Sequence, residues 1–280
     1  MKKILIVGAG GQIGSELVTY LRGLYGNGNV VAADLRQSER LAADGPFEIL
    51  DALDAERYAE LVRKYGIDSI FNLAALLSAK GEANPTLAWK INIGALTNSL
   101  EVARQYNCAL FTPSSIGAFG GDFPRDNTPQ DTIMQPNTMY GVCKVTGELL
   151  SNYYHTRFGV DTRSVRFPGI ISNVTLPGGG TTDYAVEIYY AAVKGERFVC
   201  PVSSNVYMDM MYMPDALRAT VELMEADPAK LKHRNSFNIA SMSFTPEIIY
   251  AEIRKRLPEF EMVYDVDPVK EAIAESWPNK

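Results

Sequence analysis

A glycine-rich turn near the N-terminus constrains the fold of this chain more than any other feature. The segment Gly8-Ala9-Gly10-Gly11-Gln12-Ile13-Gly14 follows a strand-like run, Lys3–Val7, and opens a helix expected from Gln12 to about Tyr25. Glycines are needed where the backbone takes positive φ or approaches a ligand closely. A helix N-terminus offers free N–H groups and a positive dipole end to a pyrophosphate. This order of strand, turn and helix predicts a dinucleotide-binding unit.

Strand-like apolar runs alternate with helical patterns through the first part of the chain. Strands are expected at residues 3–7, 30–34, 47–50, 69–73, 109–114 and 162–167, and helices at 12–25, 55–65, 87–106 and 140–158. This alternation implies a parallel sheet with helices on both faces. We therefore expect an α/β fold, a Rossmann-type doubly wound parallel sheet with a small C-terminal substrate lobe.

The alternation becomes less regular after residue 167. We expect a loop at 177–180, a helix ending at Lys194, a strand at 206–213, and helices at 215–225 and 246–256. Residues 1–170 are expected to form the cofactor-binding Rossmann domain. Residues 171–280 are expected to form mainly the substrate-binding lobe, with chain crossings back to the first domain.

Composition narrows the partners and the compartment. A net charge of −6 and a pI of about 5.1 argue against nucleic acid and anionic membranes as partners. The N-terminus does not resemble a signal peptide, and no apolar segment is long enough to span a membrane. Cys108, Cys143 and Cys200 show no metal or disulfide spacing, which predicts reduced thiols in a cytoplasmic protein. Only two histidines occur, in unrelated contexts, so we expect no metal site.

The second expected strand ends at Asp34, where a carboxylate can accept hydrogen bonds from an adenosine ribose. It would repel a 2′-phosphate, which favours NAD over NADP, although Arg36 could instead pair with that phosphate. Asp51 could bond the adenine amine, and Leu73-Ala74-Ala75 could let the backbone reach the ribose. The alternatives are a tight turn with an unrelated surface aspartate, and ordinary loop and core packing for the other segments.

Tyr140 and Lys144 stand at the start of the helix expected over residues 140–158. Residues four apart share a helix face, so the ammonium can lie beside the phenol. A free tyrosine has a pKa of about 10 and is a poor base near neutral pH, but a nearby cation favours the phenolate. Such a pair can take a proton from an alcohol, as general-base catalysis requires. The alternative is a surface tyrosine and lysine on an amphipathic helix.

Further motifs occur in order along the chain. They are Gly8, Gly11 and Gly14 at G-x-x-G-x-x-G spacing, Asn72-Leu73-Ala74-Ala75, Ile91-Asn92-Ile93-Gly94, Ser114-Ser115 and Tyr140-x-x-x-Lys144. In combination they resemble the extended branch of the short-chain dehydrogenase/reductase superfamily. This resemblance implies a catalytic set of Ser115, Tyr140 and Lys144, with Asn92 supporting the helix and a water near the lysine. Ser114 competes for the serine role, and a purely structural Ser115 is the alternative.

The same resemblance implies NAD as the cofactor. The residues expected to line its site are Gly8, Gly11, Gln12, Ile13, Gly14, Asp34, Leu35, Arg36, Asp51, Ala52, Leu73, Ala74, Ala75, Asn92, Tyr140, Lys144 and Phe167.

Three longer stretches, residues 113–120, 166–172 and 178–187, are similar to the epimerase-like L-threonine 3-dehydrogenases of that branch. The resemblance implies NAD-dependent oxidation of the β-hydroxyl of L-threonine to 2-amino-3-ketobutyrate. A helix beginning near Thr182 would offer N–H groups and threonine hydroxyls to the substrate carboxylate, unless these threonines only cap the helix. Trp277 would close the apolar side of the pocket or belong to the core, and Ser78 would lie near the substrate or in a plain loop. The residues expected to contact the substrate are Ser78, Ser115, Tyr140, Gly179, Thr181, Thr182 and Trp277.

A nucleotide-sugar 4-epimerase using bound NAD is the main alternative. Sugar dehydratases place Asp-Glu directly after the catalytic hydroxyl residue, whereas Ile116-Gly117 follow Ser115. Nucleotide-sugar epimerases usually carry an Arg-Asp-aromatic-aliphatic-His segment whose arginine faces the phosphates, and here the segment begins with Met208. Without that arginine a diphosphate would be poorly neutralised. A non-catalytic dinucleotide sensor and a dehydrogenase of another small β-hydroxy acid or amino acid are further alternatives.

The helices expected at residues 87–106 and 140–158 are long, and the resemblance implies that they pair across a two-fold axis in a homodimer. Leu96, Leu100 and Val102 could supply apolar area to that interface, or equally face the sheet. Besides a second copy of the chain, the expected partner is the small-molecule substrate L-threonine.

Overall fold

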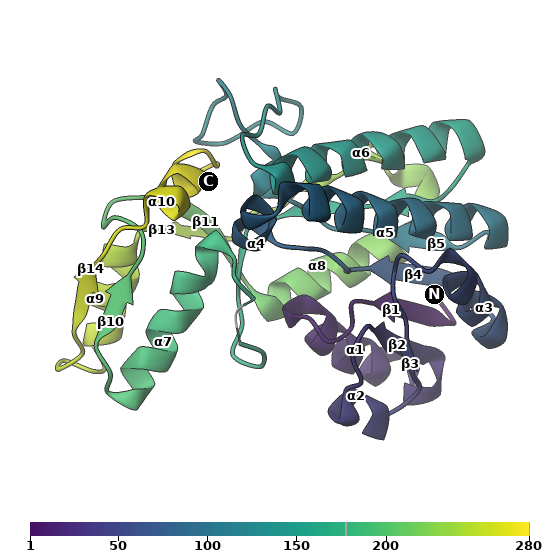
Figure 1. Ribbon diagram of the computed structural model, residues 1–280, viewed down its shortest axis with the longest axis horizontal. Coiled ribbons are helices and arrows are strands. Elements are labelled where there is room, and N and C mark those ends of the chain that lie inside the picture. The colour runs from purple at the N-terminus through teal and green to yellow at the C-terminus, as the bar shows by residue number, and fades with distance from the viewer. Residues whose placement is uncertain (177, 280) are drawn as a thin grey trace.

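A six-stranded parallel sheet forms the centre of the larger part of the molecule (Figure 1). The computed structural model describes residues 1–176 and 178–279. The strand order is β3-β2-β1-β4-β5-β7, so the order reverses between β1 and β4, where sheets of this class bind ligands. This confirms the expected Rossmann-type fold. The strands are β1 (Ile4–Val7), β2 (Val30–Asp34), β3 (Phe47–Ile49), β4 (Ser69–Asn72), β5 (Ala109–Phe111) and β7 (Thr162–Arg163).

Helices cover both faces of this sheet. Successive residues of β1 point to opposite faces and are all apolar, so each face must be buried under helices. Ile4 and Ile6 pack with α1 and α8, whereas Leu5 and Val7 pack with α3 and α5. The helices of this part are α1 (Gln12–Tyr25), α2 (Glu39–Ala43), α3 (Ala55–Tyr65), α4 (Ser78–Ala83), α5 (Pro85–Tyr106), α6 (Met139–Phe158) and α8 (Met213–Glu225), with short 3-10 helices η1 (Asn27–Asn29), η2 (Ile116–Ala118) and η4 (Pro228–Lys230).

Two of the expected strands are each divided in the structure. The run expected at 109–114 becomes β5 and β6 (Ser114–Ser115), and the run at 162–167 becomes β7 and β8 (Val165–Phe167). Pro113 has no N–H to continue the ladder of β5. Beyond it the chain joins a second sheet of order β12-β8-β6, with β12 at Phe237–Asn238. The two serines of β6 therefore lie outside the main sheet.

The remaining elements form a smaller lobe with its own core, seen at the left of Figure 1. Tyr184, Ile188, Met208 and Met210 are fully or almost fully buried in that core. Its elements are β9 (Gly169–Ile171), η3 (Thr181–Asp183), α7 (Tyr184–Lys194), β10 (Phe198–Cys200), β11 (Met208–Tyr212), β13 (Met242–Phe244), α9 (Pro246–Arg254), β14 (Met262–Tyr264) and α10 (Pro268–Glu275). Residues 178–180 lead irregularly into η3, while Pro177, where the expected loop begins, lies outside the described residues.

Two elements from the second half of the chain pack on the first half. Helix α8 packs against α1, and β12 pairs with β8. We therefore keep the division near residue 170 as a proposal in which α8 and β12 belong to the Rossmann side. Within residues 1–176 and 178–279, no helix is long and apolar enough to cross a membrane.

Candidate active site

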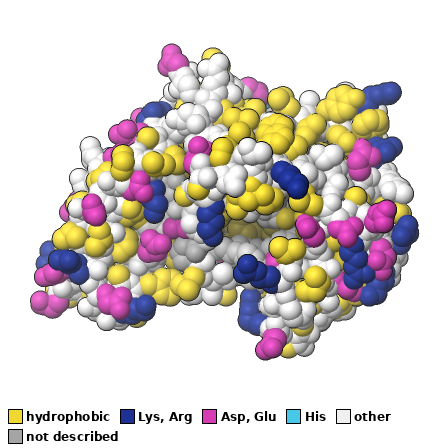
Figure 2. Space-filling model, in the orientation of Figure 1, with side chains coloured by type: hydrophobic (Ala, Val, Ile, Leu, Met, Phe, Trp, Pro, Cys, Tyr) yellow, Lys and Arg dark blue, Asp and Glu magenta, His cyan; other side chains and the backbone are white. Residues whose placement is uncertain are grey.

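A cavity of about 230 Å³ opens at the carboxyl edge of the main sheet, between that sheet and the smaller lobe. Figure 2 shows the hollowed surface in this region. The cavity brings together segments that follow β1, β4 and β5 with the starts of α6 and η3. The predicted site residues that line it are Gly8, Gly11, Gln12, Ile13, Gly14, Leu73, Ala75, Ser78, Ser115, Tyr140, Lys144, Phe167, Thr181, Thr182 and Trp277.

The glycine turn packs so tightly that side chains are excluded from two of its positions. A Cβ at Gly8, whose φ is +81°, would lie 2.7 Å from the backbone nitrogen of Ala74, and one at Gly14 would lie 2.3 Å from the Gly8 carbonyl oxygen. Helix α1 starts after Gly11 without a side-chain cap, so its first N–H groups are free for a ligand.

A buried nitrogen at the turn supports the fit to a phosphate-bearing cofactor. Gln12 Nε2 is buried in the described structure without a hydrogen-bond partner, and Gln12 lines the cavity. A buried donor of this kind needs an acceptor. The oxygens of a pyrophosphate held at the start of α1 would supply one.

Asp34 is tied to the glycine turn and is therefore not an unrelated surface residue. Its Oδ2 accepts a hydrogen bond from the Gly10 N–H at 2.8 Å, and its Oδ1 accepts one from the Arg36 N–H at 3.3 Å. Asp51 is exposed and accepts from the Leu53 N–H at 2.9 Å. The predicted residues that lie outside the cavity lining are Asp34, Leu35, Arg36, Asp51, Ala52, Ala74, Asn92 and Gly179.

Ser115, Tyr140 and Lys144 lie together at the start of α6. A Cβ built at Gly117 would be 3.2 Å from Tyr140 Cε1 and 3.4 Å from Ser115 Oγ, so the ring and the hydroxyl flank the same glycine. Lys144 Nζ lies 5.2 Å from the centroid of the Tyr140 ring. It donates one hydrogen bond to the Pro113 carbonyl at 2.6 Å, and an ammonium has two further protons to donate. Ser115 Oγ accepts from the Gly117 N–H at 3.0 Å, which leaves its own proton available.

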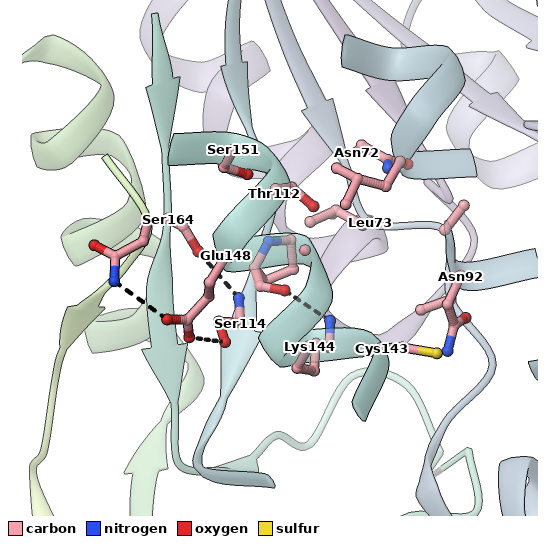
Figure 3. Close-up of a pocket in the computed structure, with 16 residues that line it drawn as sticks. Asn72, Leu73, Asn92, Thr112, Ser114, Cys143, Lys144, Glu148, Ser151 and Ser164 are labelled. Carbon is pink, nitrogen blue, oxygen red and sulfur yellow. Dashed lines mark hydrogen bonds between the residues drawn. The ribbon is translucent and has the colours of Figure 1, made fainter. Parts of the chain in front are cut away.

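Ser114 is committed to a different contact (Figure 3). Its hydroxyl donates to Glu148 Oε1 at 2.5 Å, and Glu148 pairs with Arg166 at 2.7 Å. The side chains of Glu148 and Arg166 are each only 2% exposed. The geometry therefore favours Ser115 over Ser114 for contact with a ligand.

A second, smaller cavity of about 40 Å³ lies behind Lys144 (Figure 3). Asn72 Oδ1 and Ser151 Oγ are buried there and have no partner within the described part of the chain. The volume and these polar atoms suit an ordered water. Asn92 also lines this cavity, and its amide bonds both the N–H and the carbonyl of Leu76, at 2.7 and 3.1 Å. Asn92 thus fixes the loop after β4, a contact that its sequence motif did not reveal.

The residues predicted to contact a substrate reach the larger cavity from η3, α4 and the C-terminal segment. Thr181 Oγ1 lies 3.5 Å from Ser78 Oγ, and both side chains are buried. Ser78 is the first residue of α4, so the loop alternative for it is wrong. Trp277 is 5% exposed and packs in a cluster with Ile116, Phe119, Phe123 and Ile273.

Sequence reasoning missed several lining residues, among them one carboxylate. Asp183 Oδ2 accepts hydrogen bonds from the N–H groups of Gly179 and Gly180, at 2.8 and 2.7 Å. Burial raises the pKa of the Asp183 carboxyl. The only sequence signal for Asp183 was an acidic residue near the start of a helix. Acidic residues are common there because the helix dipole favours them, so the signal did not indicate a functional residue. The other missed residues are Leu77, Pro113, Ile116, Pro168, Gly169, Ile170 and Gly180.

The cysteines and other candidate metal ligands are dispersed. Cys108, Cys143 and Cys200 are buried free thiols. Among residues 1–176 and 178–279, no group of three or more histidine, cysteine, aspartate or glutamate side chains is placed to hold a metal ion.

Comparison with known proteins agrees with this geometry. The family model described as "NAD dependent epimerase/dehydratase family" matches residues 4–240. An uncharacterized epimerase/dehydratase of Staphylococcus aureus is 58% identical over 100% of this chain and 88% of its own length. The crystal structure of an L-threonine dehydrogenase from Clostridium difficile superposes with a TM-score of 0.96 at 57% identity, covering 100% of this chain and 88% of that one. The holo form of the Cupriavidus necator L-threonine dehydrogenase gives 0.97 at 50% identity, covering 99% and 90%.

These matches span almost the whole chain, and its strand order agrees with the fold of the matched structures. They also confirm the resemblance to the extended short-chain dehydrogenase/reductase branch. This chain is an enzyme of the NAD-dependent epimerase/dehydratase family.

Proposed function

We propose that this enzyme oxidises the β-hydroxyl of L-threonine with NAD and releases 2-amino-3-ketobutyrate. The observation that carries the proposal is the convergence on one cavity of the glycine turn, the Ser115–Tyr140–Lys144 group and two threonine hydroxyls. The first would hold the cofactor and the second would carry out proton transfer. Thr181 and Thr182 would hold the substrate carboxylate.

The three polar side chains have separate tasks in this mechanism. Ser115 orients the substrate hydroxyl, since its own proton is free after its oxygen accepts from Gly117. Tyr140 takes the proton of that hydroxyl as a phenolate, the form that the Lys144 ammonium beside its ring favours. The contribution of bound NAD is to accept the hydride from the substrate Cβ. Gly8, Gly11, Gln12 and Gly14 would hold its pyrophosphate.

We propose NAD rather than NADP as the cofactor. The Asp34 carboxylate is held beside the turn by Gly10, so a 2′-phosphate at the ribose would face a fixed negative charge. The side chain of Arg36 is exposed, and only its backbone N–H bonds the Asp34 carboxylate. This contact leaves the negative charge of Asp34 in place, which supports the preference for NAD.

The nucleotide-sugar 4-epimerase is the weaker candidate. Met208 stands where the phosphate-facing arginine is expected, and it is fully buried in the core of the smaller lobe. This observation favours a substrate without a diphosphate.

One comparison of substrates tests the proposal. The purified enzyme is given NAD with L-threonine, D-threonine, L-serine or UDP-glucose, and NADH is followed by its absorbance. We expect NADH from L-threonine, less from L-serine because the missing methyl weakens binding by about 1–3 kcal/mol, and none from D-threonine or UDP-glucose. Epimerisation of UDP-glucose without threonine oxidation would reject the proposal.

We also propose a homodimer formed through α5 and α6. Leu96, Leu100 and Val102 are buried against the sheet, so they do not supply the interface. Other apolar side chains on the two helices are exposed: Trp89 on α5 and Leu149 and Tyr153 on α6. A cytoplasmic location remains a prediction from the sequence.

A further inference from the structure

An amino-acid substrate is a zwitterion, and the residues assigned so far account for only one of its charges. Thr181 and Thr182 offer hydroxyl donors to a carboxylate, but none of Ser78, Ser115 and Trp277 can neutralise an ammonium. The next residue along the chain is Asp183, which lines the same cavity. We propose that Asp183 binds the α-ammonium of the substrate and thereby selects amino acids over simple β-hydroxy acids. This inference rests on the proposed dehydrogenase function.

The carboxylate is held in a fixed orientation by the loop before it. Asp183 Oδ2 accepts from the Gly179 and Gly180 N–H groups at 2.8 and 2.7 Å. No donor within residues 1–176 and 178–279 bonds the other oxygen, Oδ1. A Cβ at Gly180 would lie 2.9 Å from Oδ1, so any other residue there would crowd this oxygen. One oxygen therefore anchors the loop, while the second is left for a ligand.

The charge of Asp183 is not neutralised within the described protein. Lys80 and Lys270 are near enough to favour its ionised form, but neither makes an ion pair with it. A half-buried carboxylate without a close cation is destabilising, and a bound ammonium would offset that cost through a charge-assisted hydrogen bond.

The order of these residues matches the shape of the ligand. The carboxylate and ammonium of an amino acid are attached to one carbon atom. In the protein, the two threonine hydroxyls and the Asp183 carboxylate come from three consecutive residues of η3. Thr181 is fixed beside Ser78, and the Thr182 side chain lies against Gly169, where a Cβ would be 2.8 Å from Thr182 Cγ2. A ligand with only a carboxylate would leave Asp183 unpaired, and its own charge would be repelled.

The substitution Asp183→Asn tests this role. The asparagine carbonyl oxygen can still accept from Gly179 and Gly180, so the loop is retained while the negative charge is lost. We expect the KM for L-threonine to rise by about 10- to 100-fold, with kcat changed less and the KM for NAD unchanged. The inhibition constant of (3R)-3-hydroxybutyrate, which is L-threonine without its amino group, should stay the same or fall.

A matched control and a second measurement separate the possible outcomes. Glu187→Gln removes a charge from the adjacent turn outside the cavity lining and should leave the KM for L-threonine unchanged. An unchanged KM in Asp183→Asn would overturn the inference, as would equal weakening of threonine and hydroxybutyrate binding, which indicates only a loop anchor. If the wild-type enzyme produces no NADH from L-threonine, the proposed function fails. Calorimetric titration of the NADH-loaded enzyme with L-threonine then tests the role of Asp183 independently of turnover. Equal binding to Asp183→Asn and Glu187→Gln rejects that role, and loss of binding in Asp183→Asn alone supports it.

Discussion

At the scale of single residues, Tyr140 gives the most direct test of the chemistry. Its ring packs against Gly117, and Lys144 lies over it at 5.2 Å. Tyr140→Phe keeps that packing and removes only the hydroxyl. We expect turnover to fall by about 10²–10⁴-fold, because proton transfer loses its base, while NAD binding, measured by fluorescence titration, is retained. Wild-type turnover in this variant would remove Tyr140 from the mechanism.

The proposed preference for NAD over NADP also depends on one residue. Asp34→Asn keeps an acceptor for the Gly10 N–H and removes the charge that faces a 2′-phosphate. We expect the ratio of kcat/KM for NADP to that for NAD to rise by about 10-fold or more. Steady-state rates with each cofactor measure this ratio. An unchanged ratio would contradict the proposed contact with the ribose.

The carboxyl group of Asp209 predicts a pH effect on stability. Burial raises its pKa to about 6, above the value of about 3.9 for an unfolded aspartate. Between these values the folded protein holds a proton that the unfolded chain has released, so the contribution of Asp209 to stability grows as the pH falls through 6 and is unfavourable above it. Asp209→Asn should therefore raise the free energy of unfolding by about 1–2 kcal/mol at pH 8 and much less at pH 4.

Urea unfolding of both proteins at the two pH values measures this difference. Comparing the variant with the wild type at each pH cancels the contributions of Glu48 and Asp161, whose pKa values are lowered by nearby cations. An equal change at both pH values would show that ionisation of Asp209 is not the cause.

Residue roles could be predicted from the sequence where a short motif carries them. The glycine spacing and the Tyr140–Lys144 pair have defined local geometry, and the structure places both in one cavity. Asp183 could not be recognised in this way, because an acid near a helix start is common and its exposure to the cavity depends on distant strands. The commitment of Ser114 to Glu148 likewise depends on a contact 34 positions away in sequence.

At the scale of secondary-structure elements, the contact between α6 and β6 is the one that positions the reacting groups. Glu148 follows Lys144 by one helical turn and joins Ser114 of β6 to Arg166 of β8. Removing one partner of a buried ion pair usually costs about 3–5 kcal/mol. We expect Glu148→Ala to lose stability on that scale and to reduce kcat as Ser115 moves relative to Tyr140.

Glu148→Gln is the matched variant, because it retains an acceptor for Ser114 and Arg166 but not the charge. Urea unfolding and steady-state kinetics, measured below the unfolding transition, separate stability from positioning. If the folded Glu148→Ala and Glu148→Gln proteins both show the wild-type kcat, the contacts of Glu148 with Ser114 and Arg166 stabilise the fold and do not position Ser115.

Elements with a local pattern were predicted well, and those that depend on distant pairing were not. The limits of α1 and α3 agree with the expectation, because glycines and apolar periodicity mark them. The strands of the smaller lobe are three to five residues long, and β11 pairs with β9 in parallel and with β13 in antiparallel fashion. Such short, non-local pairings leave little signal in any one segment.

At the scale of the whole molecule, the smaller lobe completes the site. The cavity has walls from the Rossmann sheet and from η3, and Trp277 near the C-terminus packs with Ile116 beside Ser115. Residues that line the cavity therefore come from both ends of the chain. Their convergence could be expected from the resemblance to known enzymes, whereas the hydrophobic pattern gave no indication of it.

The exposed apolar side chains of α5 and α6 predict the state of assembly. Leu149 is 65% and Tyr153 54% exposed on α6, and neighbouring exposed apolar groups commonly mark interfaces. We expect the wild-type protein to sediment as a dimer and Leu149→Arg to sediment as a monomer, because a two-fold interface places each charge twice in an apolar contact. Val193→Arg is the matched control, since Val193 is 82% exposed on α7 in the smaller lobe. The Val193→Arg protein should remain dimeric. A dimer with a dissociation constant of about 1 μM would be populated at a protein concentration of about 10 μM. If the wild-type protein sediments as a monomer at that concentration, a stable dimer through this face is excluded.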